Sequence, residues 1–169
     1  MSSLAGSFLV ARPLLRDPNF ARTVVLLLAH NDDGAFGLVV NQPADVPGLP
    51  WPLFSGGPCP APGLILLHGY PEWVEAGEAE AGAAQTVAPG VFLGDASCLE
   101  KANELSDDGA ARFRVFRGYS GWGGGQLEGE LAAGAWAVVP ATAELVFDTP
   151  PDELWDRLAP PMIPEPSVN

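Results

Sequence analysis

The residues most suited to chemistry in this chain are concentrated at positions 118–130, which read GYSGWGGGQLEGE. Six of these thirteen residues are glycine, and good helix formers over 126–133 follow the glycines. A glycine-rich loop that runs into a helix gathers unpaired backbone N–H groups at the positive end of the helix dipole. Such a junction holds an anion or an oxyanion without any charged side chain. The pattern therefore predicts an anion-binding or small-ligand site here.

The glycines of this junction match neither familiar phosphate-binding motif. The Walker motif places Lys and then Ser or Thr after its last glycine, where this chain has Gln126 and Leu127. The dinucleotide fingerprint needs GxGxxG, whereas residues 121–126 read GWGGGQ. No cofactor is predicted, and a structural turn whose glycines permit positive φ remains the alternative explanation.

A catalytic serine is disfavoured at the same place. The nucleophile elbow GxSxG needs a glycine two positions after the serine, where this chain has Trp122. The only candidate bases in the sequence are His30 and His68. No catalytic residue is predicted. The alternative to a binding protein is an enzyme acting on a small anionic substrate, with the loop holding an oxyanion and His30 as general base. That alternative loses its one plausible catalytic group if His30 is buried and distant from Ser120.

The acidic residues and cysteines predict no metal site. No pair of His, Asp or Cys residues has ligand spacing on one element, and Cys59 and Cys98 match no zinc or redox motif. Glu128 and Glu130 would lie on different sides of a helix and cannot act as a carboxylate pair on one atom. A negative charge at Glu128 stabilises the first helical turn by about 0.3–1 kcal/mol, and this effect suffices to explain an acidic residue at that position.

Composition limits the partners of the chain. Its 169 residues carry 8 basic and 21 acidic side chains, for a formal net charge of -13. Direct nucleic-acid binding is disfavoured because phosphate neutralisation needs a basic face. A modest positive patch of Arg12, Arg16, Arg22, Arg112 and Arg114 is better read as an interaction surface or as internal salt bridges. No basic leader and no membrane-length apolar run is present, so a soluble cytoplasmic protein is predicted.

Strand patterns dominate the chain. Apolar or alternating runs predict strands over 6–11, 23–30, 35–41, 63–68, 91–94, 112–117, 135–140 and 144–147, with a hairpin loop at 31–34. Capping patterns predict a helical turn at 17–20, a helix over 98–106, the helix after the glycines and a last helix that docks Leu154, Trp155 and Leu158. Residues 42–62 are proline-rich, and 71–85 read as an acidic solvated loop. The fold class is α+β with a mainly antiparallel sheet, in one domain over 1–159 and a loose tail over 160–169.

Five motifs in this order carry a resemblance to a known family. They are GSFLVARPLLRDPNFARTVVLLLAH, GAFGLVVNQP, FSGGP, GYSGWGGGQLEGELAAGAW and LVFDTPPDELW. Together they resemble the AlgH/YqgE family of small bacterial proteins and span residues 6–155. The resemblance implies a cytosolic protein with a compact bent antiparallel sheet or partial barrel and about three short helices. Its customary label, transcriptional regulator, comes with no established activity. This chain departs from the family's pattern at two places. It has Cys59 where many relatives have valine, and its segment over 71–85 is shortened.

The resemblance also marks the turns around Asn41 and Gly56. We infer that these turns lie around the glycine loop and complete one site with it. The predicted ligand-binding residues are Asn41, Pro43, Gly56, Gly57, Ser120, Gly121, Trp122, Gln126 and Glu128. Exposed turn amides would supply hydrogen bonds, and Trp122 and Trp51 would supply apolar surface. The leading hypothesis is a ligand- or protein-binding module, with a regulatory role exerted through a protein partner. Neither the ligand nor the oligomeric state follows from the sequence.

Overall fold

A computed structural model of the chain describes residues 4–12, 22–44, 53–60, 63–70, 86–94 and 112–158. The helices expected at 17–20 and 98–106, the loop at 71–85, the tail, Trp51 and Cys98 lie outside these ranges. The strands are β1 (Ser7–Ala11), β2 (Val24–Asn31), β3 (Gly34–Val39), β4 (Pro43–Ala44), β5 (Leu53–Ser55), β6 (Ile65–His68), β7 (Thr86–Ala88), β8 (Val91–Gly94), β9 (Phe113–Arg117), β10 (Ser120–Gly123) and β11 (Trp136–Pro140). The helices are α3 (Gln126–Ala132), the π-helical segment η3 (Glu144–Asp148) and α4 (Pro151–Leu158).

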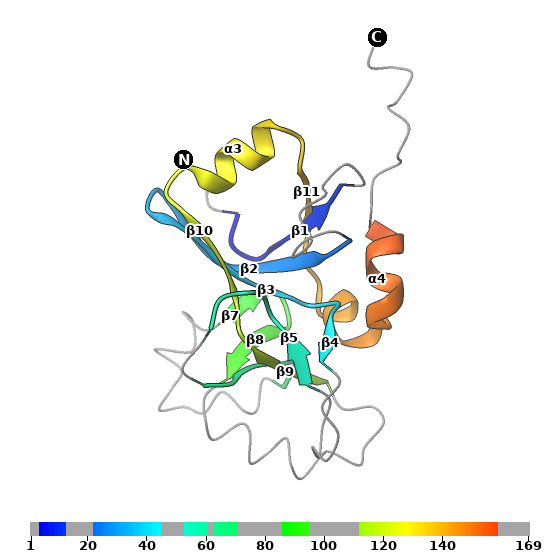
Figure 1. The fold of residues 1–169 in the computed structure, drawn as a ribbon. Coiled ribbons are helices and arrows are strands. Elements are labelled where there is room, and N and C mark those ends of the chain that lie inside the picture. The colour runs from blue at the N-terminus through cyan, green and yellow to red at the C-terminus, as the bar shows by residue number, and fades with distance from the viewer. Residues whose placement is uncertain are drawn as a thin grey trace.

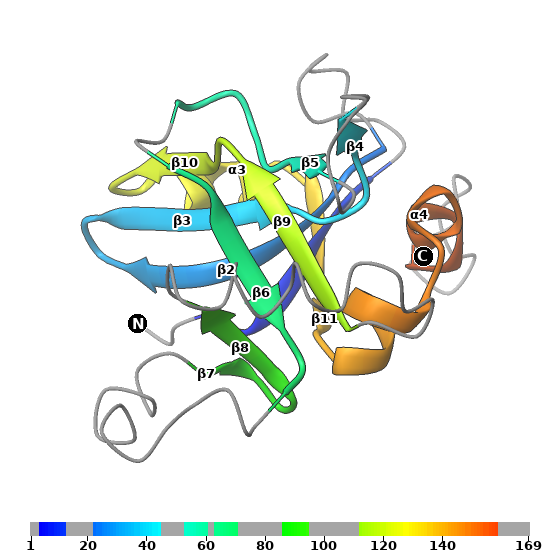
Figure 2. The same ribbon diagram turned by 90° about the horizontal axis from the view of Figure 1, so that it is seen from below.

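The strands form two sheets. The first sheet has five strands in the order β10-β3-β2-β1-β11, and all of its pairs are antiparallel. The second has six strands in the order β4-β5-β9-β6-β8-β7, and only its β5–β9 pair is parallel. Figure 2 shows β6 and β9 crossing steeply beneath β2 and β3. The predicted α+β class with mainly antiparallel, bent sheets is confirmed, and the two sheets do not close into a barrel.

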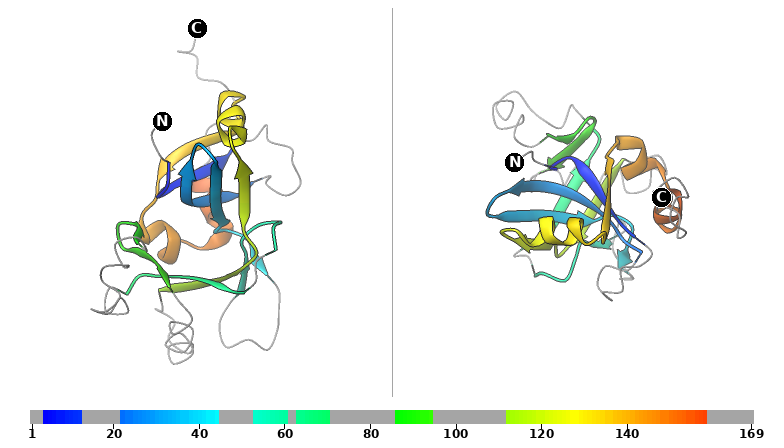
Figure 3. Two further views of the ribbon diagram at one scale, coloured as in Figure 1. Left: turned by 90° about the vertical axis from the view of Figure 1, so that its left-hand side faces the viewer. Right: turned by 90° about the horizontal axis from the view of Figure 1, so that it is seen from above.

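The first sheet is the middle layer of the molecule. Helix α3 covers one of its faces and the second sheet covers the other (Figures 1 and 3). Alternate residues of β1 therefore serve two cores: Leu9 packs under α3 with Leu127, whereas Phe8 packs toward the second sheet with Phe116. Burial on both faces explains why the strand runs read as continuously apolar. Helix α4 closes the second of these cores through Leu154.

The predicted hairpin between β2 and β3 is confirmed. Asn31 pairs with Gly34, which leaves Asp32 and Asp33 as the two turn residues. Gly34 has a φ of 143°, which side-chain-bearing residues rarely adopt. The hairpin thus depends on glycine at the position that the sequence pattern indicates.

Two predicted elements are wrong. Residues 144–147 were expected as a strand but belong to η3, where Thr142 starts a helical turn by accepting hydrogen bonds from the N–H groups of Leu145 and Val146. Short apolar runs do not distinguish strand from helix, and this cap decides the outcome. The other error is at Ser120–Gly123, expected as loop and found as strand β10, with Ser120 and Trp122 buried and the two glycines exposed.

Candidate functional site

The turn after β5 crosses the connection between β9 and β10 at very close range. Gly56 donates its N–H to the carbonyl of Arg117 at 2.9 Å, and the Ser120 hydroxyl donates to the carbonyl of Gly56 at 3.0 Å. A Cβ on Gly57 would collide with the Tyr119 carbonyl and the Ser120 Oγ. Only glycine fits at position 57, where the two segments of the chain cross. The structure thus brings Gly56, Gly57 and Ser120 together.

A surface pocket of about 340 Å³ lies beside this crossing. It is lined by Ser55, Gly57, Pro58, Cys59, Pro60, Arg117 and Gly118. Cys59 is half-buried and exchanges backbone hydrogen bonds of 2.9 and 3.0 Å with Tyr119, which fixes the pocket wall to the start of β10. Cys59 therefore lines a surface pocket and is not part of either buried core.

Arg117 is the one charged residue among the described residues that line this pocket. Other arginines are engaged: Arg112 pairs with Asp148 at 2.7 Å, and Arg114 donates to the carbonyl of Phe147 at 2.7 Å. Burial lowers the pKa of Arg114, while Asp148 opposes that shift. The Arg117 side chain is exposed at the end of β9 and makes no hydrogen bond or ion pair within the described ranges. Its guanidinium is thus available to a molecule in the pocket.

The two side chains considered for catalysis are held by structural hydrogen bonds. Ser120 is fully buried, and its hydroxyl donates to Gly56. The His30 side chain is 2% exposed; its Nδ1 accepts the N–H of Leu4 at 3.0 Å, and its Nε2 lies 2.7 Å from a carboxylate oxygen of Glu128. Nδ1 is therefore unprotonated, and Nε2 carries the proton donated to Glu128.

Strand register separates the same two groups. Ser120 lies opposite Gly37, which pairs with Leu27, three positions before His30 on β2. At about 3.3 Å per residue, that offset is roughly 10 Å along the strand. Buried, doubly hydrogen-bonded and remote from Ser120, His30 has the features of a structural histidine.

Glu128 on α3 is hydrogen-bonded to His30 on β2, and this hydrogen bond makes the stability of the fold depend on pH. Donation from His30 is the main cause that holds the pKa of the Glu128 carboxyl below its ordinary value of 4.5, followed by donation from its own backbone N–H; desolvation opposes the shift. A carboxyl whose pKa is lower in the folded state contributes stability that is present above its unfolded pKa. That contribution is lost as the pH falls through the lowered pKa.

We expect Glu128→Gln to flatten the acid side of the stability profile. The wild-type urea midpoint should fall more steeply than that of the variant below about pH 4.5, because only the wild type must protonate a hydrogen-bonded carboxylate. Urea unfolding at pH 7, 5, 4 and 3 measures this difference. The matched control is Glu153→Gln, which removes an exposed i,i+4 pair with Arg157. Parallel profiles for wild type and Glu128→Gln would contradict the link.

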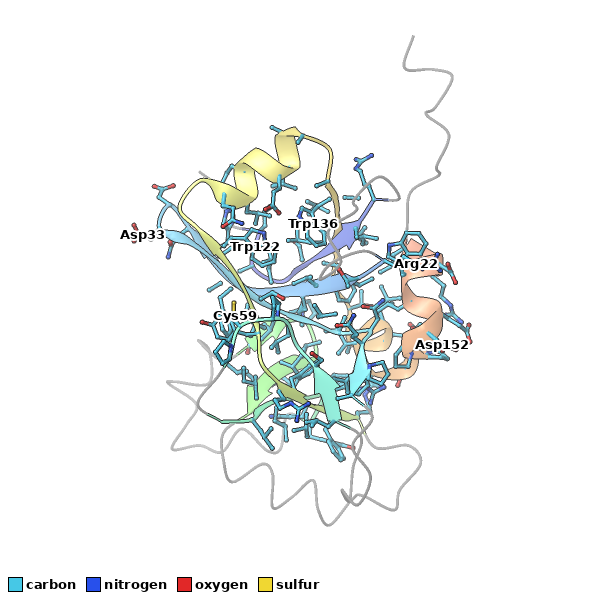
Figure 4. All side chains as sticks on the ribbon, viewed as in Figure 1. Arg22, Asp33, Cys59, Trp122, Trp136 and Asp152 are labelled. Carbon is cyan, nitrogen blue, oxygen red and sulfur yellow. The ribbon has the colours of Figure 1, made fainter. Side chains whose placement is uncertain are left out.

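Trp122 and Gln126 belong to a cluster beneath α3 rather than to the pocket at the crossing. The indole N–H groups of Trp122 and Trp136 both donate to one oxygen of Glu130, at 3.0 and 2.8 Å, and Gln126 donates to the other oxygen at 3.2 Å. The two rings lie 6.1 Å apart in an edge-to-face arrangement (Figure 4). Gln126 also accepts the N–H of Gly123 at 3.0 Å, so the chain's own side chain occupies that donor of the predicted anion site.

Asn41 and Pro43 lie at the corner between the two sheets. The Asn41 side chain accepts the N–H of Val24 at 2.9 Å and donates to the carbonyl of Arg22 at 3.1 Å, which fixes the start of β2. Pro43 begins the short edge strand β4. Neither residue lines the 340 Å³ pocket, and Gly57 is the only one of the nine predicted site residues that does.

The nine residues thus do not form one site. Gly56, Gly57 and Ser120 lie at the backbone crossing, and Asn41 and Pro43 lie at the sheet corner. The remaining four lie on β10 and α3, and the role of all nine in binding stays a prediction. Sequence reasoning missed Arg117 as a pocket residue. One signal was present: Arg117 shares a strand face with Phe113 and Val115, and a charged residue that ends an apolar face marks where that face reaches solvent. Ser120, Gly121 and Trp122 belong to strand β10 and not to a loop, so Ser120 and Trp122 point to the buried side and Gly121 lies on the exposed side.

The residues that the structure describes contain no group of three or more His, Cys, Asp or Glu side chains that could hold a metal ion. None of the described helices is long and apolar enough to span a bilayer. A second, shallower hollow of about 250 Å³ lies at the β2–β3 hairpin, next to Phe36 and Trp122.

Comparisons with known proteins agree with one another. A family model described as AlgH-like matches residues 8–166. A UPF0301 protein of Streptomyces coelicolor is 39% identical over 167 residues, covering 92% of this chain and 84% of its own, and one of Hahella chejuensis is 34% identical, covering 90% and 85%. The solution structure of AlgH from Pseudomonas aeruginosa superposes with a TM-score of 0.65 at 30% identity, covering 92% of this chain and 87% of that one. A crystal structure from Corynebacterium diphtheriae gives 0.71 at 24% identity, covering 91% and 84%.

Proposed function

We propose that this chain, which belongs to the AlgH-like family, is a binding protein for a small ligand. The names of the relatives given above state no biochemical activity, so the proposal rests on the site itself. The ligand occupies the pocket beside the crossing of the β5 turn with the β9–β10 connection. The observation that carries this proposal is the pocket of about 340 Å³ next to an arginine side chain with no partner in the described ranges. Small-molecule sites typically measure about 300–1,000 Å³, so this volume suits a small molecule.

The rigidity of the pocket wall supports binding. Gly57 and Gly118 have φ values of 149° and 78°, and a Cβ on Gly118 would lie 2.8 Å from the carbonyl of Gly57. Together with the paired backbones of Cys59 and Tyr119, this close approach fixes the wall before a ligand arrives. A pre-formed wall reduces the entropy lost on binding.

The environment of the candidate catalytic groups favours binding over catalysis. A general base needs a free lone pair within reach of the proton that it removes. His30 uses both ring nitrogens in hydrogen bonds, and the Ser120 hydroxyl is buried against Gly56. Direct contact with DNA is not part of the proposed function. Arg112 donates a hydrogen bond to Asp148, and Arg114 donates one to the carbonyl of Phe147.

Protection of the Cys59 thiol tests the proposal. The full-length protein is treated with iodoacetamide in the presence of a library of small acids, amines and neutral polar compounds, and alkylation of Cys59 is followed by peptide mass spectrometry. At least one compound should slow that alkylation about tenfold at saturation and be recovered chemically unchanged. Protection by no compound would refute a ligand site in this pocket, and conversion of the compound would replace the proposal with the enzyme alternative.

Two variants at the same position localise the effect. Cys59→Phe fills the pocket and should abolish binding of the protecting compound in an NMR titration. Cys59→Val is the matched control, because valine also removes the thiol but is much smaller than phenylalanine, so it leaves most of the pocket open and should leave binding intact. Equal binding by both variants would place the ligand elsewhere on the molecule.

A further inference from the structure

The pocket lining beside the crossing carries one positive charge. Among the described residues that line it, Arg117 is the only charged one, and the others are glycine, proline, serine and cysteine. The whole chain has a formal net charge of -13, so an anion is attracted to the protein only where a local positive charge outweighs the distant negative ones. Arg117 marks such a place.

The shape of the guanidinium narrows the ligand class. A guanidinium presents parallel N–H donors that match the two oxygens of a carboxylate in a bidentate pair. Gly57 and Gly118 line the pocket with backbone atoms alone, so an anion approaches the main chain there without side-chain obstruction. Ser55, which also lines the pocket, adds a residue with a neutral hydrogen-bonding side chain.

The charge of the pocket separates a carboxylate from a phosphate. One arginine neutralises one carboxylate charge, whereas a phosphate monoester carries about -1.5 to -2 near neutral pH. A phosphate would retain negative charge inside a strongly acidic protein that has no second cation in the described lining. We propose, on the basis of the proposed binding function, that the ligand is a small monocarboxylic acid whose carboxylate pairs with the Arg117 guanidinium.

Matched small probes test this assignment. Butyrate, its neutral isostere butyramide and inorganic phosphate are titrated at constant ionic strength into the isotope-labelled full chain. Butyrate should shift the backbone amides of Gly57, Cys59 and Gly118. It should bind at least about tenfold more tightly than butyramide, since a charge-assisted hydrogen bond is stronger than a neutral one. Phosphate should bind more weakly than butyrate.

Variants at Arg117 connect the preference to the guanidinium. Arg117→Gln should bind butyrate and butyramide equally, and Arg117→Lys should keep part of the preference because it retains charge without the bidentate geometry. Neither variant should alter the urea midpoint, since the Arg117 side chain is exposed and has no partner in the described ranges. Tighter binding of phosphate or butyramide, no shift with butyrate, or an unchanged preference in Arg117→Gln would overturn the carboxylate assignment. Such results leave the binding proposal standing if another compound still protects Cys59, because that proposal has its own tests at Cys59.

Discussion

Replacing Gly34 with alanine is expected to destabilise the protein by about 4 kcal/mol. The residue has a φ of 143°, and backbone strain of this kind costs a side-chain-bearing residue about 1–3 kcal/mol. The added Cβ would also collide with the carbonyl oxygen of Trp122, because Gly34 lies against β10 and pairs there with Gly123. Overpacking adds about 1–3 kcal/mol. The loss is a large fraction of the roughly 5–15 kcal/mol by which domains are stable.

Gly129→Ala is the matched control for this substitution. Gly129 lies in α3, and a Cβ at this position would meet no described atom within 4 Å outside the helix itself. Alanine is also the better helix former by about 0.5–1 kcal/mol. Urea unfolding followed by circular dichroism should therefore show opposite signs for the two glycine-to-alanine changes. Equal effects would mean that the β3–β10 pairing does not constrain Gly34.

The central strands could be predicted because their sequence signal comes from burial on both faces. Val24 to Leu27 are all buried, two facing each core, and such a run has few alternative structures. The turn at Asp32 and Asp33 was equally readable, since its glycine follows from local backbone geometry. Interactions that are local in sequence, or shared by every residue of a strand, are visible in a single sequence.

Elements that depend on distant partners were not predictable in the same way. Ser120–Gly123 reads as a glycine loop, and it becomes strand β10 because the edge of β3 accepts it. The apolar residues of η3 follow a strand-like pattern, yet the cap at Thr142 and the packing of Phe147 against Arg114 favour a helical turn. Tertiary pairing overrides local propensity in both cases.

The candidate site shows the same limitation more strongly. The sequence pattern predicts chemistry at the start of α3, where Gln126 and Glu128 turn out to bond with Gly123 and His30. The pocket beside Arg117 lies instead at the other end of β10, where two segments about sixty residues apart in sequence cross. At the α3 end of β10, the described residues line only the hollow of about 250 Å³ next to Phe36 and Trp122. Proximity of Cys59 and Arg117 arises only from that crossing, so no spacing rule could have paired them.

Glu130→Ala is expected to lower the free energy of unfolding by about 3 kcal/mol. The substitution removes the carboxylate oxygen that accepts the indole N–H groups of Trp122 and Trp136, which are 5% and 2% exposed. Each hydrogen bond to a charged group is worth about 1.5–3 kcal/mol, and the partial exposure of Glu130 places the sum near the lower bound. Near-ultraviolet circular dichroism and urea unfolding measure the effect, since both indoles should lose their fixed environment.

Two further glutamate variants separate the hydrogen bonds from general effects of charge. Glu130→Gln keeps an acceptor oxygen for the indoles and should cost only about 1 kcal/mol, because neutral hydrogen bonds are weaker. Glu144→Ala removes an equal charge from an exposed side chain at the start of η3 and should change stability by less than about 0.5 kcal/mol. If Glu130→Ala were as mild as Glu144→Ala, the apolar contacts of Leu127 with the first sheet would hold α3 in place without the carboxylate. The ranking of the three variants therefore shows whether α3 is attached by its polar cluster or by its apolar stripe.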